Sequence, residues 1–207
     1  LKMGYVGTNN IQYAGISVQS PFTTPETIFT QRHLNEMVKH DIKGVAIEVS
    51  SHGLALKRVD GLHFDIAIFT NVYEEHLDFH GTMEHLMSSK AKLFTSLDEK
   101  GYAILNTDDP RFYNFVKDLL HCQILTYGID HKADIMARNI ELFVDHSEFD
   151  LQIQETINHV SVPVLGRFNI SNVLAVITSL IALEMPLEQV LEAMNYMQGV
   201  DGRMELL

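Results

Sequence analysis

The most constraining feature of the sequence is a series of short, β-rich, mostly apolar runs with helical signals between them. Residues 45–49 and 66–70 are two such runs, and residues 102–106 and 123–127 continue the series. Apolar runs of this kind are typical of parallel strands that are buried on both faces. Parallel neighbours need a crossover connection, usually a helix. We therefore predict an α/β fold with a mostly parallel sheet flanked by helices.

The first helix has a recognisable beginning at Thr24, Pro25 and Glu26. Thr24 is expected to be the N-cap, and Pro25 suits the first helical position. This helix should run to about His40, with an apolar face formed by Ile28, Leu34, Met37 and Val38. The remaining helices are expected at residues 82–97, with Thr82 as a possible cap, and at 110–120, 169–183 and 187–197.

The pattern changes in the second half of the chain. Residues 140–164 show short alternating runs with turn residues, which predicts a small antiparallel β extension. A length of 207 residues favours one domain. We place that domain at residues 1–198 and an exit linker at 199–207, where Gly199 to Arg203 are found.

Composition excludes some classes of function. The formal net charge of −12 argues against nucleic acid as a partner, because phosphate backbones are bound by clustered Lys and Arg. No apolar run approaches the roughly 20 residues of a membrane span. A single cysteine, Cys122, rules out an internal disulfide and fits the cytoplasm. We expect no membrane association and see no sign of an obligate protein partner.

Polar residues gather after the first of the two central runs, from Glu48 to Leu54. An acid at the end of a buried strand is costly unless it is paired. A divalent cation beside a nucleotide is one partner, since carboxylates suit magnesium. A side chain that simply reaches solvent is the alternative, and Glu48 alone does not decide between the two.

A denser polar cluster follows the second run, from Thr70 to Gly81, and it contains Glu74, Glu75, His76, Asp78 and His80. Ligands of open α/β sheets gather at the carboxyl ends of strands, so this density favours a functional site. Zinc is a rival to magnesium, but the cluster lacks the cysteines of a structural zinc site.

Two other features have ordinary structural interpretations. By spacing alone, Lys90 is a solvated helix lysine. Asn169 and Asn172 share one face of a predicted helix, and Asn169 could merely cap it. Their two amides could instead bind a base edge, because each offers a donor and an acceptor.

Taken together, these strings resemble the Mur ligases, and within that family the UDP-N-acetylmuramoyl-tripeptide synthetases. The matching strings follow the family's order along nearly the whole chain: Gly4 to Thr8, Thr23 to Glu26, Glu48 to Leu54, Thr70 and Asn71, His76 to Gly81, Lys90, Asn106 to Asp109, Gly166 to Asn172, and Gly202 to Glu205. The resemblance implies the central, P-loop NTPase-like domain of a three-domain enzyme.

The resemblance also implies roles for individual residues. Glu48 and His76 match magnesium ligands, and Lys90 matches a lysine that family members carbamylate, which would make it an oxygen ligand. Thr23, Thr24, Ser50 and Arg58 match residues that bind the muramoyl-peptide substrate. Asn106, Asn169, Asn172 and Arg203 match residues that face the nucleotide. The sequence departs from the family pattern at Glu75, where Asp is common, and at Leu56, where some members have a polar contact.

The implied activity is ATP- and Mg²⁺-dependent. It joins a free amino acid, L-lysine or meso-diaminopimelate, to a UDP-N-acetylmuramoyl dipeptide through an acyl phosphate, as a step of peptidoglycan synthesis. No G-x-x-x-x-G-K-[ST] phosphate loop occurs in the sequence. We therefore expect this chain to be part of a longer enzyme and inactive alone.

Two alternatives remain open from the sequence. Another amide ligase of the same superfamily, similar to folylpolyglutamate or cyanophycin synthetase, would share most of the strings. A non-catalytic binding module would also explain the missing phosphate loop.

Overall fold

The computed structural model describes residues 2–197, and these form two compact units. Unit 1 contains residues 1–63 and 74–93, and unit 2 contains residues 64–73 and 94–207. The predicted single domain at 1–198 stays a prediction, and the linker expected at 199–207 lies outside the described residues. No helix in the described part of the chain is long and apolar enough to cross a membrane.

Unit 1 is built on a four-stranded sheet with the order β3-β2-β1-β4. Its strands are β1 (Met3–Val6), β2 (Asn10–Tyr13), β3 (Ile16–Gln19) and β4 (Gly44–Ile47). The first three are antiparallel neighbours, and β1 and β4 pair in parallel. Ala14 and Gly15 both have positive φ and turn the chain between β2 and β3, as hairpins of two-residue loops require.

The helices of unit 1 are α1 (Thr27–Lys39), α2 (Ser51–Ala55), α3 (Leu77–His80) and α4 (Met83–Thr95), whose last two residues belong to unit 2. Met37 on α1 is buried with Val6, Ile11 and Tyr13 of the sheet, and Phe29 and Leu34 pack against that cluster. Thr82 accepts a hydrogen bond from the backbone N–H of His85 at 3.2 Å, which confirms it as a cap of α4.

Two details of the predicted first helix are wrong. The helix begins at Thr27 with Glu26 as N-cap, because the Thr24 hydroxyl instead bonds the carbonyl oxygen of Glu48 at 2.9 Å. The apolar face is also rotated. Ile28 and Val38 are 71% and 73% exposed, and the buried positions are Thr30 and Met37.

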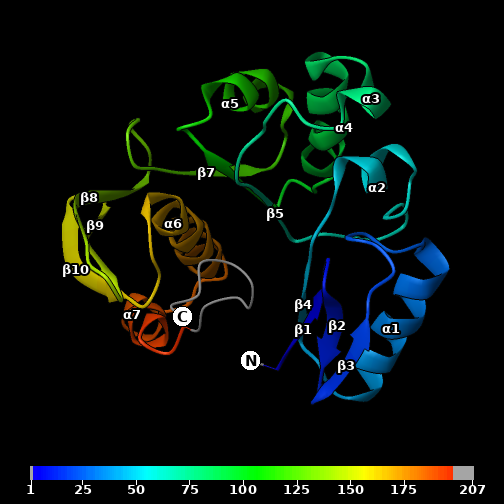
Figure 1. Ribbon diagram of the computed structural model, residues 1–207, viewed down its shortest axis with the longest axis horizontal. Helices are drawn as coiled ribbons and strands as arrows, with labels where there is room; N and C mark the ends of the chain where they lie inside the picture. The colour runs from blue at the N-terminus through cyan, green and yellow to red at the C-terminus, as the bar shows by residue number, and fades with distance from the viewer. Residues whose placement is uncertain (1, 198–207) are drawn as a thin grey trace. The chain divides into compact units, whose positions relative to one another are not determined.

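Unit 2 contains a six-stranded sheet with the order β10-β9-β8-β7-β6-β5. The strands β5 (Ile66–Phe69), β6 (Tyr102–Asn106), β7 (Gln123–Gly128) and β8 (Ile135–Leu142) pair in parallel. The strand β9 (Ser147–Ile153) pairs with β8 in antiparallel orientation, and β10 (Thr156–Val162) pairs in the same way with β9. The predicted mostly parallel α/β sheet and its antiparallel extension are therefore confirmed (Figure 1).

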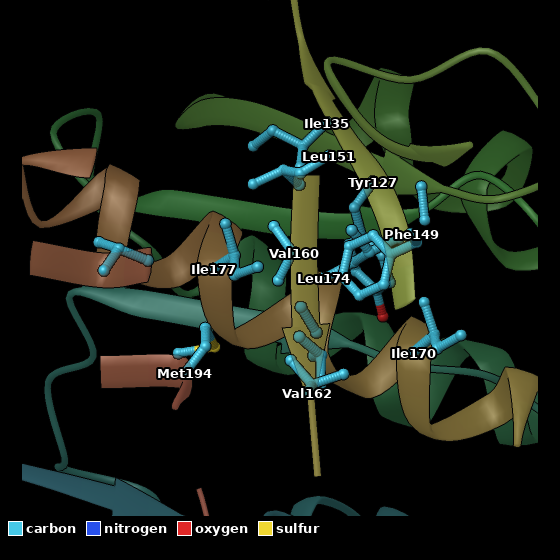
Figure 2. Packing of buried hydrophobic residues seen from close by; sticks show 14 of the residues in the cluster. Tyr127, Ile135, Phe149, Leu151, Val160, Val162, Ile170, Leu174, Ile177 and Met194 are labelled. Carbon is cyan, nitrogen blue, oxygen red and sulfur yellow. The ribbon is translucent and has the colours of Figure 1, made fainter. Parts of the chain in front are cut away.

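The core of unit 2 lies between this sheet and the helix α6 (Arg167–Ala182). Ile170, Leu174 and Ile177 of α6 point toward Phe149, Leu151, Val160 and Val162 of the strands (Figure 2). The helix α7 (Leu187–Met194) adds Val190 and Met194 to the same cluster.

The helix α5 (Pro110–Val116) and the short 3-10 helix Lys117–Leu119 connect β6 to β7. Phe112 of α5 stacks on Phe69 of β5, with 4.0 Å between ring centroids.

The two central runs of the sequence do not form neighbouring strands. β4, which precedes Glu48, is the edge of the sheet in unit 1, whereas β5 is the edge of the sheet in unit 2. The expectation that residues 45–49 and 66–70 are strands of the same mostly parallel sheet is therefore wrong. Apolar composition identifies buried strands, but it does not say which strands pair.

Candidate functional site

Glu48 follows β4 directly, and its carboxylate is held by side chains from the β1 end of unit 1. The Tyr5 hydroxyl donates to Oε1 at 2.5 Å. The backbone N–H of Thr8 donates to Oε2 at 3.0 Å, and Thr8 Oγ1 lies 2.6 Å from the same oxygen. Both carboxylate oxygens of Glu48 therefore accept hydrogen bonds within the protein. Glu48 is thus fixed at a strand end rather than extended into solvent.

The predicted substrate residues cluster beside Glu48. The Thr24 hydroxyl is bonded to the carbonyl of Glu48, and it accepts from the backbone N–H of Ser50 at 2.8 Å. Ser50 caps α2 by accepting from the Gly53 N–H at 3.1 Å. Thr23 lies 3.1 Å from Thr8, oxygen to oxygen. The structure therefore brings Thr23, Thr24 and Ser50 around the end of β4.

Arg58 joins this group from the segment after α2. Its Nη1 donates to the Thr24 carbonyl at 3.1 Å, and its Nη2 pairs with Glu26 at 2.9 Å. The guanidinium also lies over the ring of Phe22. Its Nε is buried and has no hydrogen-bond partner among the described residues. Arg58 is thus a largely buried cation at the Thr24 end of the cluster.

A group of imidazole rings forms the other part of the site. His52 on α2 contacts His76 and His80, with 4.7 and 5.5 Å between ring centroids, and it also packs on Phe79. His80 is buried, and its Nε2 lies 3.0 Å from Ser51 Oγ. This contact joins α3 to the start of α2, which begins three residues after Glu48.

His76 itself is the N-cap of α3 and has the left-handed backbone conformation, with φ of 57°. Histidine tolerates this region better than most residues, yet it is uncommon there. Such conformations cluster at functional sites because the surrounding structure must compensate for them. The polar cluster at residues 70–81 contains the short helix α3, which begins at Leu77 directly after His76.

Lys90 lies on α4, half-buried rather than fully solvated. Burial is the main cause that lowers the pKa of His80, and the positive charges of His52, His76 and Lys90 lower it further. Lys90 is therefore near the imidazole group that contains His76. Glu48, His76 and Lys90 all belong to unit 1, but direct contact between Glu48 and the other two stays a prediction.

The donors of unit 1 fit a magnesium ion that is bound together with phosphates. The described residues contain no group of three or more His, Cys, Asp and Glu side chains that could hold a metal. Mg²⁺ commonly uses only one or two carboxylates and takes its other ligands from water and substrate phosphates. The carboxylate of Glu48, held at both oxygens, suits that arrangement, whereas a closed structural zinc site would need four protein ligands.

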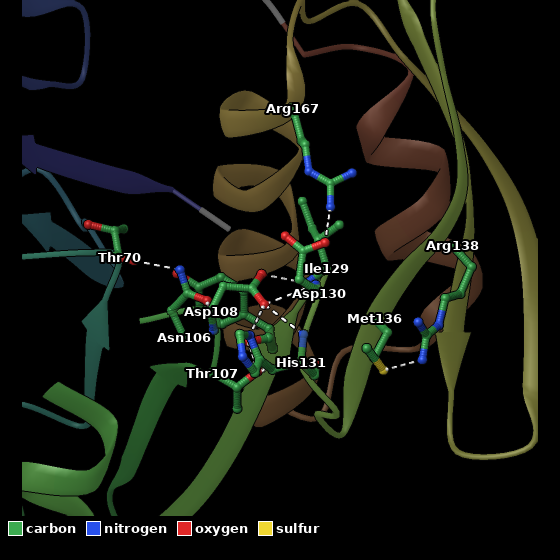
Figure 3. A network of polar contacts seen from close by, with 11 residues as sticks. Thr70, Asn106, Thr107, Asp108, Ile129, Asp130, His131, Met136, Arg138 and Arg167 are labelled. Atoms are coloured by element: carbon green, nitrogen blue, oxygen red, sulfur yellow. Dashed lines mark hydrogen bonds and ion pairs between the residues drawn. The ribbon is translucent and has the colours of Figure 1, made fainter. Parts of the chain in front are cut away.

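Asn106 lies in unit 2 and is already bonded within the protein. Its Nδ2 donates to the Thr70 carbonyl at 2.7 Å, and its Oδ1 accepts from the Asp108 N–H at 2.9 Å (Figure 3). The side chain is only 6% exposed. Asn106 therefore connects the ends of β5 and β6, and its predicted contact with a nucleotide stays a prediction.

Asn169 and Asn172 lie together on the first turns of α6. Asn169 Nδ2 donates to the Leu165 carbonyl at 2.9 Å, and Asn172 Nδ2 donates to Asn169 Oδ1 at 3.3 Å. The N-cap of the helix is Gly166, so Asn169 is not the cap. Asn172 is exposed. Arg167, at the start of the same helix, forms an ion pair with Asp130. Arg203, which is also predicted to face the nucleotide, lies outside the described residues.

Several residues of the site were not singled out by sequence reasoning. Tyr5 and Thr8 belong to the Gly4–Thr8 string, but nothing in that string shows which carboxylate they contact. His52 lies inside the Glu48–Leu54 string and acts as the centre of the imidazole group. Cys122 is not part of the site. Burial raises the pKa of its thiol, which disfavours the reactive thiolate form.

Comparison with known proteins identifies the family of the chain. Residues 1–180 match the family described as "Mur ligase middle domain". The UDP-N-acetylmuramoyl-L-alanyl-D-glutamate–L-lysine ligases of Staphylococcus haemolyticus and Staphylococcus epidermidis are 37% and 38% identical over 98% of the chain. The chain spans 42% of the length of each.

Solved structures give the same result. A UDP-N-acetylmuramoyl-L-alanyl-D-glutamate–2,6-diaminopimelate ligase matches 99% of the chain, which covers 42% of that structure, with a TM-score of 0.87 and 27% identity. The MurF ligase of Thermotoga maritima in complex with ADP matches 78% of the chain, covering 37% of its own, with a TM-score of 0.64 and 19% identity. The last likeness shows the fold alone. By its family match and by its curated relatives, the chain belongs to the Mur ligase family.

Proposed function

We propose that this chain is the central part of an ATP-dependent ligase that adds the third amino acid to UDP-N-acetylmuramoyl-L-Ala-D-Glu in peptidoglycan synthesis. The observation that carries the proposal is the cluster in unit 1: Glu48 held by Tyr5 and Thr8, with Thr23, Thr24 and Ser50 around it. The named activity of relatives at 37–38% identity supports the same step. Because those relatives are L-lysine ligases, L-lysine is the first amino acid to test and diaminopimelate the second.

The reaction has two steps. An oxygen of the substrate carboxylate forms a bond to the γ-phosphorus of ATP, and ADP leaves, which gives an acyl phosphate. The amine of the amino acid then forms a bond to the acyl carbon, loses a proton, and phosphate leaves. Catalysis of such transfers depends mainly on positioning and charge neutralisation. When bound, Mg²⁺ supplies much of that neutralisation.

The residues of this chain contribute positioning and charge. Glu48 and His76 would hold the cation, and Thr23, Thr24, Ser50 and Arg58 would bind the muramoyl peptide. Asn106, Asn169, Asn172 and Arg203 would face the nucleotide. Lys90, as a carbamate, would add an oxygen ligand. A cytoplasmic location is part of the proposal, because ATP and a uridine nucleotide are its substrates.

The experiment that tests the activity uses the full-length protein. Phosphate release is measured with the muramoyl dipeptide nucleotide and L-lysine, with diaminopimelate and with folate plus glutamate. The proposal is supported if phosphate is released with the muramoyl dipeptide nucleotide and an amino acid, and not with folate plus glutamate. Phosphate release only with folate plus glutamate would favour a ligase similar to folylpolyglutamate synthetase. No phosphate release with any of these substrate pairs would favour a binding module.

Lys90→Ala tests the predicted carbamate. Because the carbamate supplies a carboxylate-like oxygen, we expect turnover to fall by about 10²-fold or more, the usual scale for loss of a positioned charge. A small carboxylic acid such as formate should restore part of the activity. Lys92→Ala, two residues along the same helix, is the matched control. Unchanged turnover in Lys90→Ala would remove Lys90 from the reaction.

A further inference from the structure

We infer that Tyr5 is a positioning residue that orients the Glu48 carboxylate for cation binding. Thr8 is a second hydrogen-bond donor to this carboxylate. Gly7, which has no side chain, leaves room for Tyr5 to reach Glu48. The inference rests on the proposed function, because it takes Glu48 to be a ligand of Mg²⁺. It gives a role to the Gly4–Thr8 string, which the proposed reaction does not otherwise use.

The strand register places these residues on one face. β1 and β4 pair in parallel with Tyr5 opposite Ala46 and Val6 opposite Ile47. The Glu48 N–H continues the ladder by donating to the Val6 carbonyl at 2.8 Å. Side chains alternate between the faces of a sheet, so Tyr5, Gly7 and Glu48 share a face. Tyr5 and Glu48 are diagonal neighbours, with Gly7 between them.

Gly7 has no side chain, and this leaves room for the hydrogen bond between Tyr5 and Glu48. A Cβ at position 7 would lie 2.1 Å from the Tyr5 hydroxyl oxygen, 2.4 Å from Tyr5 Cζ and 2.8 Å from Glu48 Cδ. Gly7 is itself buried, which limits how far these neighbours can move. Any other residue at this position would displace the tyrosine, the carboxylate or both.

The two donors act on different oxygens. Tyr5 binds Oε1 at 2.5 Å, whereas the Thr8 hydroxyl and N–H bind Oε2 at 2.6 and 3.0 Å. A carboxylate that is held at both oxygens cannot rotate freely about its last side-chain bond. A glutamate that rotates freely would lose this rotational freedom when it binds a cation, and the lost conformational entropy would weaken the affinity for the cation. Residues that hold a metal ligand in this way commonly govern metal affinity.

The test replaces Tyr5 with phenylalanine in the full-length enzyme, which removes the hydroxyl and keeps the ring. We expect the Mg²⁺ concentration for half-maximal ligation to rise about 10-fold, the lower end of the range for residues behind a metal ligand. The kcat at saturating Mg²⁺ should change little. Mn²⁺ binding in the presence of ADP, followed by electron paramagnetic resonance, should weaken by the same factor and does not depend on turnover.

Matched variants separate positioning from general destabilisation. Tyr113→Phe is the control for the hydroxyl, because Tyr113 lies on α5 of unit 2 and its ring contacts Lys117. Gly7→Ala should raise the Mg²⁺ requirement as Tyr5→Phe does. Gly44→Ala is its control, because the added Cβ there meets only the flexible end of the Met3 side chain.

Glu48→Gln separates failure of this inference from failure of the proposed function. A changed Mn²⁺ affinity in Glu48→Gln with none in Tyr5→Phe overturns the role of Tyr5 and leaves the ligase proposal intact. A lower melting temperature of Tyr5→Phe at unchanged Mn²⁺ affinity overturns it too, because the bond is then only structural. Unchanged Mn²⁺ affinity in both variants overturns Glu48 as a ligand, whether or not the enzyme ligates.

Discussion

At the scale of single residues, the Asp108 carboxylate organises the loop that follows β7. It accepts backbone N–H bonds from Ile129, Asp130 and His131 at 2.6, 2.9 and 2.8 Å (Figure 3). Asp108→Asn puts an NH₂ group where one acceptor oxygen was, so at least one of these donors loses its partner. We expect a loss of about 2–3 kcal/mol in the free energy of unfolding, measured by urea denaturation.

The pH dependence of the same residue gives a second readout of this prediction. Burial alone would raise the pKa of Asp108, but the hydrogen bonds from Ile129, His131 and Asp130 outweigh it and lower the pKa below its ordinary value. The stabilisation is therefore present above the unfolded-state pKa and is lost as pH falls through the folded-state pKa. Asp118→Asn, at an exposed position, is the control. Equal acid sensitivity of Asp108→Asn and the wild type would contradict the prediction.

Single residues also show what the sequence can and cannot reveal. Acids and histidines after apolar runs identified Glu48 and His76 as candidates, because strand ends are where ligands bind in α/β sheets. The local sequence predicts Thr24 as a helix cap, since a threonine before a proline suits that role. Its hydroxyl instead bonds Glu48 and Ser50, and nothing in the sequence around Tyr5 indicates its contact with Glu48. Both contacts depend on which strands pair, and local patterns do not contain that information.

At the scale of elements, the antiparallel extension of unit 2 has a chain of alternating histidines and acids on its surface. His146 pairs with Asp145 and Glu148, and His159 pairs with Glu148 and Asp150. Hydrogen bonds that the two imidazoles donate to the carboxylates of Asp145 and Asp150 are the main causes that raise the pKa values of His146 and His159. The extension consists of β9 and β10, and the contacts of His159 on β10 with Glu148 and Asp150 on β9 link its two strands.

These raised pKa values predict how the stability of the extension depends on pH. A histidine with a raised folded-state pKa stabilises fully below its unfolded-state pKa, and that stabilisation is lost as pH rises through the folded-state pKa. We expect amide hydrogen exchange in β9 and β10, corrected for intrinsic rates, to show less protection above neutral pH than near pH 6. His159→Gln should flatten this dependence, and His121→Gln in unit 2 should not. Protection that rises with pH in the wild type would refute the prediction.

The sequence predicts where helices and strands lie better than it predicts which of them pair or pack together. Apolar, β-rich composition located β4, β5, β6 and β7, and alternation of apolar and polar residues located the extension. Both are visible locally, because burial of a strand on one or two faces sets the pattern of its apolar residues. The predicted face of α1 is wrong in part. Leu34 and Met37 pack on the sheet as expected, whereas Ile28 and Val38 are exposed and Phe29 packs there instead. All of them fit a helical period, and only the position of the sheet decides which side of the helix is buried. The separation of β4 and β5 into two sheets has the same origin, since strand order is not a local property.

At the scale of the whole molecule, the 207-residue chain contains the residues that we propose bind metal, substrate and nucleotide, but no phosphate-loop sequence. Backbone N–H groups at a helix N-terminus are the usual holders of the β- and γ-phosphates, and a net charge of −12 repels a polyanion. We therefore expect this chain alone to give no saturable heat in calorimetry with ATP and Mg²⁺ up to about 1 mM, which corresponds to less than about 4 kcal/mol of binding free energy. The full-length protein, titrated under the same conditions, is the control that should bind. Micromolar, Mg²⁺-dependent binding by the isolated chain would mean that its own residues suffice to hold the phosphates.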